Sequence, residues 1–166
     1  MISIPKNGIV ITNATVLSSW LDYNDHMNVA YYIAAFDIGI DELKAVYGID
    51  SNYIATEQCS TVALEAHITY QNEASLGEKI KIGSRILDFD GKRTHLYQEM
   101  HRGNDLLATQ ETLSISFDLK VRKSRPFEPA IARNIEAMCN AQLALPRPRW
   151  AGRGIGIKKG KPENHN

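Results

Sequence analysis

The spacing of apolar residues along the chain predicts a strand followed by one long helix. Residues 9–18 form a short, β-branched apolar run, which is typical of a strand. From Val29 to Tyr47 the large apolar residues recur every three or four positions, and Gly48 follows as a natural stop. This pattern predicts a helix of about five turns with Asn28 as its N-cap. Alanines fill much of its remaining surface, so we expect it to be buried on most sides.

Beyond Gly48 the pattern becomes strand-like. Apolar and polar residues alternate near 61–72, 79–89, 93–102 and 106–120, and turn residues separate these segments at 75–77, 90–91 and 103–105. We expect hairpins at these turns and therefore antiparallel neighbours. Two prolines then lead into a second, more exposed helix over about 130–143. The simplest packing is an α+β fold in which one antiparallel sheet wraps around the long helix.

Composition separates a folded domain from a basic tail. A chain of 166 residues with 43% hydrophobic content supports one core, which we place in residues 1–144. Residues 145–166 hold six basic side chains and one acidic, a net charge of +5, so the rest of this neutral chain carries −5. We expect the tail to be disordered or to lie over a neighbouring subunit. A nucleic-acid arm is disfavoured because Trp150 is its only aromatic residue and the domain is acidic.

The sequence also indicates a cytoplasmic protein. It has no apolar run of about 18 residues and no basic N-terminal segment followed by an apolar signal core, so we expect no membrane association. Cys59 and Cys139 form no Cys-x-x-Cys pair, which supports neither a disulfide framework nor a zinc knuckle.

Candidate chemistry lies immediately before the long helix. Asp22, Asn24 and His26 alternate there, and an extended backbone would point all three side chains to one side. The unpaired N–H groups of a helix start bind partially negative oxygens, and here they belong to Asn28, Val29 and Ala30. A base, an amide and an oxyanion site together suit hydrolysis of an activated carbonyl. The alternative is that the Asp and Asn side chains merely cap a helix.

These residues carry a family resemblance. The order of elements and the segment Asp22–Tyr32 resemble the hotdog-fold thioesterases of the 4-hydroxybenzoyl-CoA and acyl-ACP thioesterase type, and plant acyl-ACP thioesterases share Asp-x-Asn-x-His. The chain is more similar still to the thioesterase domains fused or linked to carnitine dehydrogenase, proposed to hydrolyse betainyl-CoA. Those domains show three motifs, Asp-Tyr-Asn-Gly-His-Met, Glu-x-His-Ile and Lys-Arg-x-His-Leu. The matching segments of this chain are residues 22–27, 65–68 and 92–96. The resemblance covers about residues 9–140.

Two positions depart from the family pattern. Asp25 stands where many relatives have glycine, and its carboxylate is a candidate to cap the helix or to meet a cationic acyl group. Ala74 stands where a cysteine nucleophile was proposed in the plant enzymes, so we expect no such nucleophile here. Glu73 beside it matches a glutamate of those enzymes and is a secondary candidate for catalysis.

The resemblance implies an acyl-CoA thioesterase. Asp22 would act as general base or as nucleophile, Asn24 would orient water, and His26 would hold the loop or donate to the thioester. No metal and no cofactor are implied beyond the CoA of the substrate, and hotdog proteins are generally homodimers or homotetramers with the site between subunits. The expected substrate-binding residues are Asp25, Tyr32 and, for the CoA phosphates, Lys92, Arg93, Arg122 and Lys123. An aromatic lining for a quaternary-ammonium acyl group is available from Trp20, Tyr23, Tyr31, Tyr32 and Tyr70.

Several alternatives stay open at this stage. The basic pairs are equally explained as solvated hairpin and strand ends, and the aromatic residues as core. A metal site would have to use histidines and a glutamate of the sheet, but no tight ligand pair supports it among Glu65, His67, His95 and His101. The same fold also serves acyl-CoA-binding sensors without turnover and enoyl-CoA dehydratases.

Overall fold

The computed structural model describes residues 4–157. Both predicted helices and all five predicted strands are present, and a short helix α2 and a two-residue strand β6 are additions that the pattern did not predict. In chain order the elements are β1 (Val10–Thr15), a 3-10 turn (Ser18–Trp20), α1 (Val29–Tyr47), α2 (Ser51–Glu57), β2 (Cys59–Tyr70), β3 (Lys79–Phe89), β4 (Arg93–Arg102), β5 (Asp105–Asp118), β6 (Lys123–Ser124) and α3 (Pro129–Ala141).

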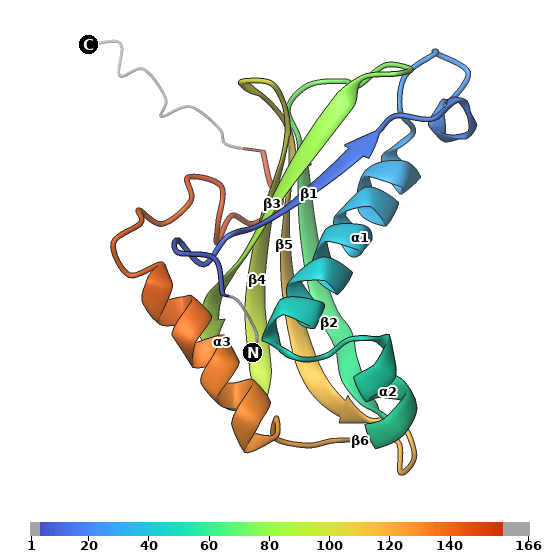
Figure 1. The fold of residues 1–166 in the computed structure, drawn as a ribbon. Coiled ribbons are helices and arrows are strands. Elements are labelled where there is room, and N and C mark those ends of the chain that lie inside the picture. Colours follow the sequence, from blue (N-terminus) through green and yellow to red (C-terminus); the bar gives the residue numbers. More distant parts are fainter. Residues whose placement is uncertain (1–3, 158–166) are drawn as a thin grey trace.

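The strands form one antiparallel sheet that curls around α1, which confirms the predicted fold class (Figure 1). The sheet order is β1-β3-β4-β5-β2, and β6 pairs with the end of β5. Hairpins join β3 to β4 and β4 to β5 as predicted, but the hairpin expected at residues 75–77 is wrong. β2 pairs with β5 and β3 pairs with β1, so the 71–78 connection crosses the end of the sheet. A turn signal marks a change of direction, whereas strand pairing is decided by which face and edge remain to be covered.

Helix α1 begins and ends where the sequence predicts. The Asn28 side chain accepts a hydrogen bond from the Ala30 N–H at 3.0 Å, and Gly48 ends the helix in the left-handed region with a φ of 110°. The helix lies close to the sheet at Gly39, where an added Cβ would stand 2.7 Å from Nε2 of Gln98. That amide donates to the Phe36 carbonyl at 2.8 Å and to the Ser84 hydroxyl at 2.8 Å.

The expectation that α1 is buried on most sides is wrong for the single chain. The face toward the sheet is buried, including Phe36 and Leu43 with 0% exposure. The opposite face is open and partly apolar, with Val29 57%, Ile33 48% and Ile38 45% exposed. The helix therefore has two faces that suit burial, of which the chain itself covers one.

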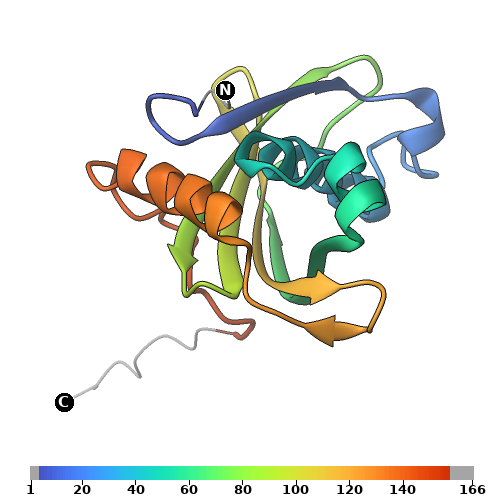
Figure 2. The ribbon, with the colours of Figure 1, turned by 60° about the horizontal axis from the view of Figure 1, so that its bottom comes forward.

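Helix α3 packs on the same concave face of the sheet, beside the C-terminal end of α1 (Figure 2). Its Ile131, Ile135 and Met138 pack in a second core cluster with Leu43 and Tyr47 of α1. A separate cluster forms around Tyr32 and Phe36, toward the N-terminal end of α1.

The segment after α3 lies on the outer face of the sheet, opposite α1. We expected these residues to be disordered or to lie on another subunit, but residues 146–152 bind this chain's own strands. Arg85 of β3 donates to the Pro146 carbonyl at 2.9 Å, and the Gly152 N–H donates to the Glu111 carboxylate of β5 at 2.7 Å. The remainder of the basic tail, residues 158–166, lies outside the described residues.

Candidate active site

The loop before α1 is a tight turn, and this corrects the extended conformation expected from its alternation. The Asp22 N–H donates to the His26 carbonyl at 2.9 Å, and the Asp25 N–H donates to the Asp22 carbonyl at 3.1 Å. Asp25 has a φ of 62°, a conformation that glycine adopts freely and aspartate tolerates. Glycine, the residue of the family pattern at this position, would adopt the same backbone conformation without strain. Asn24 is exposed at the tip of the turn, so the three side chains do not form one row.

The Asp22 carboxylate is held at the base of this turn. Its Oδ1 accepts a hydrogen bond from the Asn24 N–H at 2.8 Å, and its side chain is half-buried. Within residues 4–157 no hydrogen bond is made to Oδ2, which leaves one oxygen available to a ligand. Asp22 therefore does not cap α1, because that role belongs to Asn28.

The start of α1 offers one unpaired amide. Of the three groups proposed as oxyanion donors, the Asn28 N–H donates to the Trp20 carbonyl at 2.9 Å and the Ala30 N–H is taken by the Asn28 side chain. The Val29 N–H has no partner among the described residues. This amide lies at the positive end of the helix dipole. The Val29 residue is 57% exposed at this end of the helix.

Glu73 is brought to this loop by the connection after β2. Its Oε1 lies 3.3 Å from Nε2 of His26. The two segments are tied by the Met27 N–H, which donates to the Ala74 carbonyl at 2.7 Å, and by a bridge between His26 and Ser75. The structure therefore brings together Asp22, His26 and Glu73, which are up to 51 positions apart in the sequence.

A charged clamp that the sequence did not reveal holds the Glu73 segment. Arg102, in the β4–β5 hairpin, donates to both carboxylate oxygens of Glu78 at 2.9 and 2.8 Å and to the Glu73 carbonyl at 3.4 Å. Glu78 in turn accepts from the Ser75 N–H at 3.0 Å, and this bond, followed by the Arg102 pairing, holds the pKa of Glu78 below its usual range. Arg102 and Glu78 lie 24 positions apart, so no local pattern links them.

The aromatic residues fall into three settings. Trp20 stacks on Tyr31 with ring centroids 5.8 Å apart, beside the loop. Tyr32 is 3% exposed, packs edge-on against Tyr70, and donates to the Asn72 carbonyl at 3.3 Å; burial raises its pKa. Tyr32 thus supports the 72–74 segment, whereas Tyr23 is 95% exposed.

Within one protomer, the four basic residues expected to bind CoA phosphates lie at the end of the sheet opposite the Asp22 loop. β3 begins at Lys79 beside β1 near the loop and runs its full length before the turn that carries Lys92 and Arg93 (Figure 1). At about 3.3 Å per residue, this distance is roughly 30 Å. Arg93 pairs with Asp90 at 2.7 Å. The other two residues follow the far end of β5, where Arg122 lies over the Phe117 ring and Lys123 opens β6.

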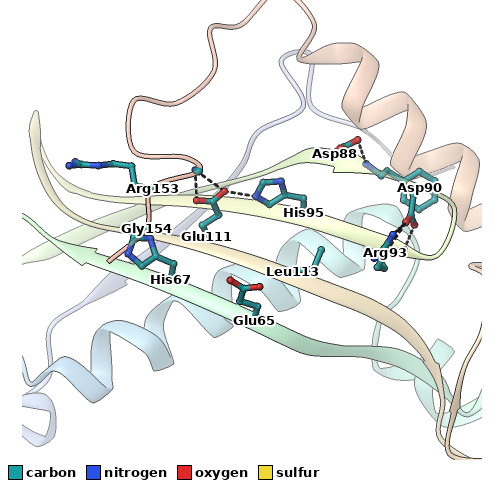
Figure 3. A pocket seen from close by; sticks show the side chains of 12 residues that line it. Glu65, His67, Asp88, Asp90, Arg93, His95, Glu111, Leu113, Arg153 and Gly154 are labelled. Carbon is teal, nitrogen blue, oxygen red and sulfur yellow. Dashed lines mark hydrogen bonds and ion pairs between the residues drawn. The ribbon is translucent and has the colours of Figure 1, made fainter. Parts of the chain in front are cut away.

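Two of the cavities of the described chain lie on the outer face of the sheet, away from Asp22. The first, of about 540 Å³, is lined by Glu65, His67, His95 and Glu111 together with residues of the β3–β4 turn and the 152–154 segment (Figure 3). His95 Nε2 lies 2.5 Å from Glu111 Oε1. His101 lines the second cavity instead, so the four groups considered for a metal do not converge. In the described chain, no three His, Cys, Asp or Glu side chains are placed to hold a metal ion.

The curled sheet, the long central helix and the carboxylate loop at the helix start define a protein of the hotdog thioesterase class. The chain belongs to the thioesterase-like superfamily, which it matches over residues 16–135. It is 32% identical to the betainyl-CoA thioesterase of Pseudomonas aeruginosa over 144 residues, which cover 86% of this chain and 91% of that protein. The family resemblance drawn from the Asp22 segment is thereby confirmed.

Two further relatives differ in length and in evidence. The L-carnitine dehydrogenase/betainyl-CoA thioesterase of Ruegeria pomeroyi is 33% identical over 147 residues, covering 89% of this chain and 30% of that longer protein. A hypothetical protein of Staphylococcus aureus, solved in complex with CoA, superposes with a TM-score of 0.85 at 26% identity, covering 90% of this chain and 96% of that one. No helix of residues 4–157 is long and apolar enough to span a membrane.

Proposed function

We propose that this protein hydrolyses an acyl-CoA thioester to the free acid and CoA, with Asp22 as the group that activates water. The observation that carries this proposal is the half-buried Asp22 carboxylate, with one oxygen unpaired in the described chain, in the loop that leads into α1. Membership of the thioesterase-like superfamily supports the reaction class.

The chemistry needs few groups. Asp22 takes a proton from water, and the hydroxide forms the new C–O bond at the thioester carbonyl. The oxyanion accepts a hydrogen bond from the Val29 N–H, a kind of contact worth about 10²–10³ in turnover. The C–S bond then breaks and the CoA thiolate receives the proton held by Asp22. Direct attack by Asp22, through a mixed anhydride that water opens, uses the same groups.

His26 and Glu73 act beside this centre. Their contact at 3.3 Å orients the imidazole at the edge of the loop, where it can donate to the thioester. Glu73 has a 68% exposed side chain, so it remains accessible to the acyl group as well.

For the acyl group we propose betaine or a similar small cation. The rim of the site carries the carboxylates of Asp25 and Glu73, and the stacked rings of Trp20 and Tyr31 lie beside it. Carboxylates and aromatic faces are the groups that bind a quaternary ammonium. The relatives in Pseudomonas aeruginosa and Ruegeria pomeroyi carry betainyl-CoA in their names.

We further propose that the working unit is a homodimer or a larger assembly of such dimers. β2 is an edge strand whose centre, residues 63–66, is exposed, and the open apolar face of α1 includes Ile33 and Ile38. Antiparallel pairing of two β2 edges would cover both surfaces. It would also carry the Arg122–Lys123 end of one protomer toward the Asp22 loop of the other, because each β2 runs from that end to the loop.

We propose a cytoplasmic location because both cysteines are free thiols. Cys59 and Cys139 are both unpaired, as expected of a reducing compartment.

The test is thiol release from betainyl-CoA and from its neutral isostere, the tert-butylacetyl thioester, in which carbon replaces nitrogen. Acetyl-, medium-chain and aromatic thioesters complete the panel. We expect betainyl-CoA to turn over faster than the isostere. Asp22→Asn should lower kcat by about 10²–10⁴-fold. The matched control is Asp50→Asn, which makes the same exchange at the N-cap of α2, where asparagine caps as well as aspartate.

Each other outcome has a definite meaning. Full turnover in Asp22→Asn would move the base to Asp25 or Glu73. Binding of CoA without turnover of any substrate would identify an acyl-CoA-binding protein. Equal rates on betainyl-CoA and its isostere would refute the cationic specificity while leaving the reaction intact. Asp25→Asn should reduce the preference for betainyl-CoA over its isostere by up to about fivefold, because an exposed charge pair contributes up to about 1 kcal/mol.

A further inference from the structure

The second outer-face cavity is an open groove between the sheet and the segment that follows α3. It measures about 560 Å³ and lies on the side of the sheet opposite α1, so it is separate from the Asp22 loop. Strands β1, β3 and β4 form its floor, and residues 146–149 form its wall. We call it the basic cavity, after four of its lining residues: Lys81, Arg85, Arg147 and Arg149.

The charges of the basic cavity are not balanced within the described chain. None of its four cations forms an ion pair with residues 4–157. Its one carboxylate, Glu99, already accepts a hydrogen bond from the Tyr97 hydroxyl at 3.2 Å and contacts His101 at 3.2 Å. Four cations around one cavity repel each other unless an anion lies between them.

Arg85 adds a second, independent observation. One Nη atom donates to the Pro146 carbonyl at 2.9 Å, but the Nε of Arg85 is buried and has no hydrogen-bond partner. Burial lowers the pKa of the Arg85 guanidinium, the Glu99 carboxylate opposes this, and the nearby Arg147 adds to the lowering. A buried charged donor without an acceptor is rare in folded proteins and indicates an acceptor that the described chain does not itself supply, such as an ordered water or an anion.

The rest of the lining indicates what else the ligand carries. Ile9, just before β1, and Ile11 of β1 flank Gly83, which has no side chain, and Ile11 is 48% exposed. Pro146 and Pro148 face this apolar floor from the wall. The volume is that of sites for drug-sized or nucleotide-sized molecules. The guanidinium fork matches phosphate oxygens in a paired geometry.

We propose that the basic cavity binds a phosphorylated small molecule of nucleotide size, with its phosphates on Arg85 and Arg147 and its less polar part over Ile9 and Ile11. The adjacent cavity of Figure 3 lies across the same segment and has a mixed lining, in which Asp90 pairs with Arg93 and Glu111 contacts His95. The site is independent of thioester hydrolysis, and its ligand has two sources, a free nucleotide or the nucleotide end of a CoA molecule.

The experiment is calorimetric titration of the full chain with ADP, inorganic pyrophosphate, adenosine and CoA. We expect ADP to bind more tightly than pyrophosphate, and adenosine to bind weakly or not at all. Arg85→Gln and, separately, Arg147→Gln/Arg149→Gln should each weaken ADP binding by about tenfold or more, because each removes charge-assisted hydrogen bonds. The second variant changes only exposed residues of the 146–149 segment, so it tests the site even where Arg85→Gln unfolds.

The matched control is Arg133→Gln, which removes the same charge from an exposed position of α3. It should leave ADP binding unchanged. Loss of ADP binding with unchanged CoA binding identifies a free nucleotide as ligand, and parallel loss of both identifies the nucleotide end of CoA. Unchanged ADP affinity in both cavity variants, or ADP binding that acyl-CoA displaces in wild type and variants alike, would overturn the proposal.

Discussion

Replacing Gly39 with alanine tests how closely α1 is held against the sheet. The new Cβ would lie 2.7 Å from Nε2 of Gln98, 3.0 Å from Oγ of Ser84 and 3.1 Å from Cγ2 of Ile82. Gln98 is 1% exposed, so its amide has little room to move. The amide must give up its two hydrogen bonds, to Phe36 and Ser84, and the remaining close contacts with Ser84 and Ile82 still crowd the new methyl group.

The expected cost follows from these contacts. Overpacking a core costs about 1–3 kcal/mol. The two hydrogen bonds contribute about 1 kcal/mol each. Alanine recovers about 1 kcal/mol through its higher helix propensity. The free energy of unfolding should therefore fall by about 2–4 kcal/mol, which lowers Tm by roughly 5–15 °C in a chain of this size.

Urea and thermal unfolding followed by circular dichroism measure this change. Asp37→Ala, at an exposed position of the same helix, is the control and should stay within about 0.5 kcal/mol of wild type. In a double-mutant cycle, Gln98→Ala should relieve much of the cost of Gly39→Ala. A Gly39→Ala protein as stable as wild type would show that Gln98 does not set the distance between helix and sheet.

Three further predictions concern the site and its surroundings. Asn28→Ala should lower the free energy of unfolding by about 1 kcal/mol in urea titrations, because the N-cap bond is lost, and an unchanged midpoint would contradict the cap. Arg102→Gln should release the Glu78 and Glu73 segment and lower kcat for thiol release by up to about 10²-fold with Asp22 intact, and an unchanged kcat would refute the clamp. Backbone N–H groups of the β3–β4 turn, with the Arg93 side chain, lower the pKa of Asp90 from 3.8 to about 2. A carboxyl group whose pKa is lowered by folding stabilises the fold at any pH above its ordinary pKa. The excess in free energy of unfolding of wild type over Asp90→Asn should therefore be full at neutral pH, shrink as pH falls from about 4, and vanish near pH 2. A constant difference across that range would exclude the charge as its cause.

The elements of this fold follow from local chemistry. Helix α1 begins after Asn28 and ends at Gly48. An amide side chain caps a helix start, and glycine accepts the left-handed conformation at a helix end. The β3–β4 and β4–β5 hairpins likewise form at turn residues adjacent in the chain. The location of the candidate site was also predictable, because Asp22 and the helix start are neighbours in the sequence.

Tertiary structure decided what depends on contacts between distant residues. It paired β2 with β5, placed Glu73 against His26, and set Arg102 on Glu78, none of which has a local signature.

It also placed residues 146–152 over the outer face, where this segment forms part of the wall of two cavities, although composition alone assigned these residues to a loose tail. The physical reason is that periodicity and capping report on the nearest few residues, whereas strand order, ion pairs and cavities arise from which surfaces remain to be covered once the chain has collapsed.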